Sequence, residues 1–137
     1  MAKTLRLADR REIIAFTGES PREGVERALE DSDECWTYVL DDEPIAMCGL
    51  LNDGDGSANI WMLGSYKIKD VKMQFLRDAQ EHFDTLMEKY TRVWAFADVR
   101  NRVHQKWYEW MGFKILTMVH TGPFNLPFYH IEYNKEI

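Results

Sequence analysis

The stretch ANIWMLGSYKIKDVKMQFLRDAQEHFDTLMEKYTRVWAFADV, Ala58 to Val99, decides the fold. Its middle predicts a long amphipathic helix, because apolar side chains recur every three or four residues and charged ones fall between them. The apolar positions are Val71, Phe75, Leu76, Ala79, Phe83, Leu86, Met87 and Tyr90. The flanking runs ANIWML and RVWAFADV are typical of strands, and the second is apolar almost throughout, like a strand covered on both faces. A strand, a helix and a strand in succession predict a right-handed parallel crossover.

The residues near the start predict a strand and two helices. KTLRLA has the pattern of a short strand, and a helix follows it, in which the carboxylate of Asp9 can accept hydrogen bonds from first-turn amides. SPREGVERALEDSD predicts a second helix with Ser20 as its cap and Pro21 at its first position.

Two further strands, CWTYVLD and PIAMCGLLN, flank a charged turn at Asp41 and Asp42 and lead into ANIWML as an antiparallel meander. With the turn at those residues, Cys35 and Cys48 would face each other across the hairpin. Free buried thiols are the expected state in a reducing compartment, and the redox state of the pair stays open. Two cysteines form no disulfide framework, and no CxxC, HExxH or EF-hand pattern predicts a metal site.

The C-terminal part predicts one helix and two strands. NRVHQKWYEWMGF has the pattern of a short amphipathic helix, and FKILTMVH and FYHIEYN are strands joined through TGPFNLP. The full order is β-α-α-β-β-β-α-β-α-β-β. This order predicts an α/β (α+β) fold with a mixed, mostly antiparallel sheet and helices on its faces, in a single domain over residues 1–137.

Composition excludes several functions. A net charge of −6 argues against extended binding to nucleic acid or an anionic membrane, which requires a positive field over much of one face. No apolar run approaches the ~18 residues of a membrane span, and the first residues have no signal-peptide pattern. A cytoplasm, including that of a host, is the expected location.

The element order resembles that of the GNAT family of acyl-CoA-dependent N-acyltransferases, over nearly the whole chain. LRLADRREIIAF is similar to the family's first strand and helix, and DDEPIAMCGLLN to the hairpin between its second and third strands. The late N-x(6)-Y-x(3)-G-F pattern of the family is matched by Asn101, Tyr108, Gly112 and Phe113.

A narrower resemblance is to the small GNAT-like internal virion or morphogenesis proteins of short-tailed phages. It is carried by DSDECWTYVLDDEPIAMCG, by the long helix ending LMEKY, and by the aromatic strand that begins at Trp94. It implies a location in the host cytoplasm or the virion, and phage virion or host proteins as partners.

In active family members, a glycine-containing loop and the helix after it hold the cofactor pyrophosphate with backbone amides. The corresponding segment is GSYKIKDVK, Gly64 to Lys72, and bulkier residues occupy the family's glycine positions. Asp70 is expected to cap the helix and to repel a phosphate. The resemblance assigns cofactor contacts to Ser65, Lys67, Lys69, Val71, Lys72 and Asn101. The plainer alternative is that the lysines are solvated loop residues.

Tyr108 matches the family position that supplies a proton to the leaving thiolate, and the alternative is a core aromatic residue. Asp98 could order a water as the general base, and Glu34 is a weaker candidate. His104 stands where the family usually has a small residue, so it would either block the cofactor channel or be structural. The tryptophans around this region, Trp94, Trp107 and Trp110, would fill the space for an acyl chain or contact a partner.

Two functions therefore stay open. One is an acetyl-CoA-dependent N-acetyltransferase, with a degenerate cofactor loop. The other is a non-catalytic virion-associated or host-factor-binding protein on a GNAT scaffold, with no cofactor. Because function resides in the site, the fold does not separate them.

Overall fold

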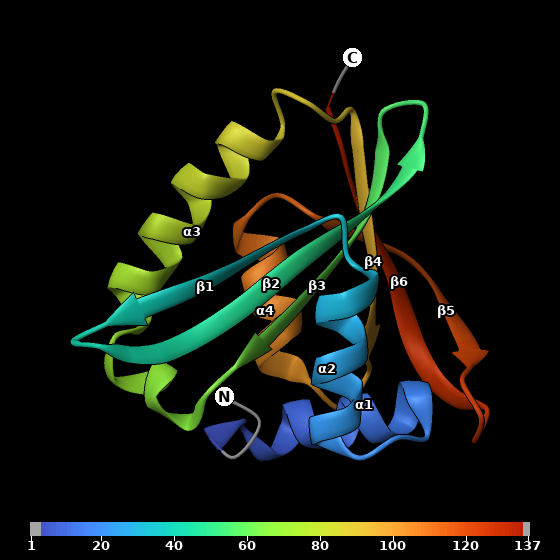
Figure 1. Ribbon diagram of the computed structural model, residues 1–137. Helices are drawn as coiled ribbons and strands as arrows, with labels where there is room; N and C mark the ends of the chain where they lie inside the picture. Colours follow the sequence, from blue (N-terminus) through green and yellow to red (C-terminus); the bar gives the residue numbers. More distant parts are fainter. Residues whose placement is uncertain (1–3, 136–137) are drawn as a thin grey trace.

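The computed structural model describes residues 4–135, in which a six-stranded sheet has α3 and α4 on one face and α1 and α2 against the other (Figure 1). The helices are α1 (Leu7–Thr17), α2 (Pro21–Asp31), α3 (Lys72–Leu86) and α4 (Arg102–Trp110), with a 3-10 helix η2 (Tyr66–Asp70). The strands are β1 (Glu34–Leu40), β2 (Glu43–Gly54), β3 (Ser57–Gly64), β4 (Arg92–Asp98), β5 (Lys114–Thr121) and β6 (Leu126–Asn134). No helix in this part of the chain is long and apolar enough to cross a membrane.

The strand order is β1-β2-β3-β4-β6-β5, and only β3 and β4 are parallel. This parallel pair is short: it ends at Asn59 and Trp94, although β3 continues to Gly64 and β4 to Asp98. The two strands therefore separate toward their C-terminal ends. Side chains from α1 and α4 are bonded to the two strand ends, Asp9 to Gly64 of β3, and Glu12 and Gln105 to Asp98 of β4.

The predicted fold class and element order are confirmed, with the first strand reduced to a single bridge between Leu5 and Ser65. Lys3 of the expected strand KTLRLA lies outside the described residues. The helix begins at Leu7, and its N-cap, Arg6, makes no side-chain cap. The expected capping role of Asp9 is thus wrong, because this carboxylate turns inward and binds groups from other elements.

At α2 the predicted cap is present, since the Ser20 hydroxyl accepts from the backbone N–H of Glu23 and Pro21 opens the helix. At α3 the expected cap is wrong. The 3-10 helix η2 inserts before α3 and buries Ile68, which leaves Asp70 exposed at the end of η2 and makes Val71 the N-cap. Val71 provides no side-chain cap.

The β1–β2 hairpin turns at Asp41 and Asp42, both with positive φ (50° and 64°), as a tight hairpin requires. A bulge beyond Tyr38 shifts the register by one residue, so that Cys35 pairs with Gly49 and Cys48 pairs with Trp36. A shift of one residue reverses the face to which a side chain points. The expected facing of the two cysteines is therefore wrong, and both thiols are free.

Candidate functional site

A buried polar cluster lies where β3 and β4 separate, and Asp9 of α1 is at its centre. Its carboxylate has no exposed surface. One oxygen accepts the N–H of Gly64 at 2.7 Å, and the other accepts Nδ2 of Asn101 at 2.8 Å and Nη1 of Arg6 at 3.1 Å. Asp9 thereby ties α1 to the end of β3 and to the start of α4.

His104 completes the cluster from the first turn of α4. Its Nε2 is 2.9 Å from Asp9 Oδ1, and its Nδ1 is 3.3 Å from Glu12 Oε2. Burial opposes protonation of the imidazole, but the two carboxylates outweigh it and raise the pKa of His104 to about 10. For Asp9, burial acts to raise the pKa, and His104, Arg6 and the Gly64 N–H hold it below its ordinary value. The pair is an imidazolium and a carboxylate.

Metal-ligating atoms of Asp9, Glu12 and His104 all lie within 4.8 Å of one another. The two carboxylates, however, approach opposite nitrogens of the same ring. One ion cannot bind both nitrogens, and the oxygens of Asp9 already accept several N–H groups. The arrangement suits an internal ion cluster better than a metal centre.

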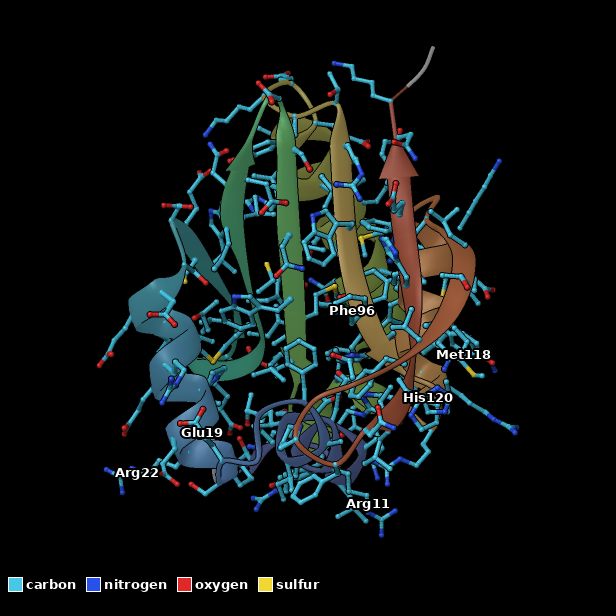
Figure 2. All side chains as sticks on the ribbon, turned by 90° about the vertical axis from the view of Figure 1, so that its right-hand side faces the viewer. Arg11, Glu19, Arg22, Phe96, Met118 and His120 are labelled. Atoms are coloured by element: carbon cyan, nitrogen blue, oxygen red, sulfur yellow. The ribbon has the colours of Figure 1, made fainter. Side chains whose placement is uncertain are left out.

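Tyr108 lines a cavity of about 280 Å³ on the α1–α2 side of the sheet, together with Glu12 and Phe96. Figure 2 shows Phe96 on the sheet face that this side presents, above α1. Burial, and after it the charge of Glu12, raises the pKa of Tyr108 well above its ordinary value, so its hydroxyl stays protonated. In this position the hydroxyl can donate a hydrogen bond into the cavity.

The two base candidates lie elsewhere. Asp98 is buried and held by the Arg100 guanidinium at 2.6 Å, and it does not line the cavity of Tyr108. Glu34 bonds to Lys89 and Tyr90, on the α3 side. Glu12 is the carboxylate that the fold brings beside Tyr108. Its one signal in the sequence is its spacing of three residues from Asp9, which puts both on one face of α1.

The residues that were expected to contact the cofactor lie in different surroundings. Ser65 is buried and accepts from the backbone N–H of Lys67, whose ammonium pairs with Glu43. Lys69 and Lys72 are exposed and form no ion pair within residues 4–135. Asn101 belongs to the Asp9 cluster.

Val71 precedes the first turn of α3, which has no side-chain cap. No residue from Ser65 to Val71 lines the cavity of Tyr108 or the cavity beneath α3.

The three tryptophans have different surroundings. Trp107 is buried and packs against His104 and Phe75, with ring centroids 4.9 and 5.5 Å apart, and its ring lies against Gly64 at the end of β3. Trp94 is half-buried on the open sheet face, and Trp110 is exposed. Trp107 is therefore a core residue, whereas Trp94 and Trp110 are available at the surface to contact a partner.

No family model matches the chain. The probable scaffold protein gp13 of Escherichia phage T7 is 29% identical over 99 residues, which are 69% of this chain and 67% of that protein. A GNAT-family acetyltransferase from Bacillus anthracis aligns with a TM-score of 0.70 and 15% identity, over 96% of this chain and 84% of that chain. The aminoglycoside acetyltransferase AAC(6')-Ib, in complex with coenzyme A and kanamycin, aligns with a TM-score of 0.62 and 18% identity, over 93% and 85% of the two chains. With its separated parallel strands, the chain has the fold of the GNAT acetyltransferases.

Proposed function

We propose that this chain is a phage assembly protein that retains the GNAT fold without acetyl transfer. The observation that carries the proposal is the ion cluster of Asp9, Glu12 and His104, which is bonded to the ends of both separated strands, Asp9 to the N–H of Gly64 and Glu12 to the N–H of Asp98. An acyl thioester in this fold would have to enter the gap between β3 and β4. Its partners would be phage virion or host proteins, in the host cytoplasm or in the particle.

Opening the gap for an acyl chain would be costly. The carboxylate of Asp9 would lose the N–H of Gly64 and the amide of Asn101, and the imidazolium of His104 would lose its counter-ion. Separating a buried ion pair so that one charge stays unpaired costs about 3–5 kcal/mol. Coenzyme A would have to supply this energy in addition to its own binding.

The loop after β3 also argues against a bound pyrophosphate. Between Ser65 and Lys72 it contains no glycine, and η2 fills it with a turn anchored by the buried Ile68. The ammonium of Lys67 is neutralised by Glu43. Similarity to a probable phage scaffold protein supports the assembly role independently of these arguments.

Two measurements on the intact protein test the proposal. Acetyl-CoA at millimolar concentration should leave the melting temperature unchanged, while an active GNAT acetyltransferase under the same conditions shows a clear shift, because a ligand that binds only the folded state raises stability. Mass spectrometry of particles and assembly intermediates from infected cells should detect the chain. Micromolar binding of acetyl-CoA, or absence of the chain from every particle, would overturn the proposal.

A second candidate function is acetyl transfer, favoured by the protonated hydroxyl of Tyr108 beside Glu12 in one cavity and by the uncapped N-terminus of α3. In it, Tyr108 is the acid and Glu12, which lines the same cavity, is the base. If acetyl-CoA binds, Tyr108→Phe should lower turnover and leave binding unchanged. Equal turnover in that variant would remove Tyr108 from the mechanism.

A further inference from the structure

A second cavity, of about 260 Å³, lies across the sheet from that of Tyr108, between α3 and strands β1 to β3. Most of its wall is apolar or aromatic. The wall includes Trp36, Tyr38, Cys48, Phe75, Asp78 and His82. Neither the ion cluster nor the loop after β3 contributes a side chain to this cavity.

Two polar side chains of α3 reach this cavity. Asp78 and His82 are four residues apart, so they lie one turn apart on the same face of the helix. The Asp78 carboxylate accepts a hydrogen bond from the hydroxyl of Tyr38 at 2.5 Å, and no basic side chain among residues 4–135 is paired with it. A half-buried carboxylate in apolar surroundings is thus left without a counter-ion.

His82 is also incompletely satisfied. Its Nε2 is buried and has no hydrogen-bond partner within the described chain. Burial lowers the pKa of His82, so the ring is neutral and can accept a hydrogen bond at one nitrogen and donate one from the other. Trp36 stands edge-on to this ring with centroids 4.5 Å apart, at the boundary of the cavity. Native proteins rarely leave such atoms unpaired without a reason.

We propose that this cavity binds a small organic ammonium ion, with the charged nitrogen at Asp78 and the hydrocarbon body against the aromatic wall. The rings of Trp36, Tyr38 and Phe75 add an attraction for a cation near their faces. A carboxylate ligand would be repelled by Asp78, and a neutral one would leave its charge uncompensated. The volume is below the about 300 Å³ at the lower end of ordinary ligand sites, so the ligand is compact.

Three probes of the same shape and different charge test the site: phenethylammonium, 2-phenylethanol and phenylacetate. Calorimetry on the intact chain should show phenethylammonium binding at least about tenfold more tightly than the alcohol, with no binding of phenylacetate. Only the cation gains the attraction of Asp78. In a two-dimensional NMR spectrum, the indole N–H of Trp36 should shift with the ligand, and that of the exposed Trp110 should not.

Matched variants locate the charge. Asp78→Asn keeps the size of the side chain and should lose about tenfold in affinity, since it removes the counter-ion. Asp84→Asn, on an exposed face of the same helix and outside the cavity, should bind as the parent does. Tyr38→Phe retains the carboxylate and should also bind. If the Asp78 variant fails to fold, the preference of the parent for the amine over the alcohol still tests the site.

Absence of binding for all three probes at millimolar concentration, equal affinity for the amine and the alcohol, or unchanged affinity in Asp78→Asn would overturn the proposal. None of these outcomes depends on coenzyme A or on particle assembly. The ligand site and the proposed assembly function can therefore fail separately.

Discussion

The cluster around Asp9 and the cavity beside Asp78 contain the same two kinds of side chain, a carboxylate and a histidine, on opposite sides of the sheet. At Asp9 the carboxylate has a neighbouring imidazolium, a guanidinium and two N–H donors. At Asp78 the carboxylate accepts a hydrogen bond from one hydroxyl and has no basic partner among residues 4–135. Buried charges that are paired hold separate elements in one arrangement, because separating them is costly, whereas a carboxylate without a counter-ion beside a cavity is available to a cation.

The largest effect on stability should come from removing the carboxylate of Asp9, at the centre of the ion cluster. Asp9→Ala leaves the His104 imidazolium and the Asn101 amide without their partner, so the free energy of unfolding should fall by about 3–5 kcal/mol. Urea denaturation measures this change. Asp70→Ala, at an exposed position, is the control and should stay within about 0.5 kcal/mol of the parent. A loss below about 1 kcal/mol for Asp9→Ala would mean that the cluster does not stabilise the fold.

The next effect is a dependence on pH. The pKa of His104 is raised from its ordinary 6.5 to about 10, so the folded state favours the protonated ring. The stabilisation is complete below pH 6.5 and is lost as the pH rises through 10. The melting temperature should fall over that interval. His104→Gln should be less stable at pH 6, and its difference from the parent should narrow by pH 10; a constant difference would contradict the assigned charge.

Removing the charge of Asp78, beside the second cavity, should cost little stability. Asp78→Asn should change the free energy of unfolding by less than about 1 kcal/mol, because the carboxylate is half-buried and the amide oxygen can still accept from Tyr38. Chemical denaturation beside Asp9→Asn gives the comparison directly. If the two variants lose equal stability, the distinction between a structural site and a ligand site is wrong.

The smallest effect concerns the thiols. Burial, with the neighbouring Cys35, raises the pKa of Cys48 to about 12, whereas Cys35 is exposed, so a thiol reagent should modify Cys35 first. Cys48 lines the cavity of Asp78, so bound phenethylammonium should slow its modification further. Mass spectrometry after timed labelling measures both rates. Slower labelling of Cys35 alone would place the ligand elsewhere.

Much of the fold could be predicted because its signals are local. The spacing of apolar residues in α3, the Ser20 cap of α2 and the strand–helix–strand order each depend on residues near one another in the chain. The assignments that were wrong depended on irregularities that such patterns do not contain. One bulge beyond Tyr38 moved the two cysteines to opposite faces, and one turn of 3-10 helix removed Asp70 from its expected cap.

The site shows the same division. Asn101 and Tyr108 could be placed on one short helix from their spacing, and His104 could be suspected as an obstruction in the channel. The partner that explains them, Asp9, lies 92 residues from Asn101 in the chain. Local periodicity sets which residues form helices and strands, because those hydrogen bonds join near neighbours. Which charges meet, and which are left free beside a cavity, follows from packing between distant elements, where burial makes each pairing strong.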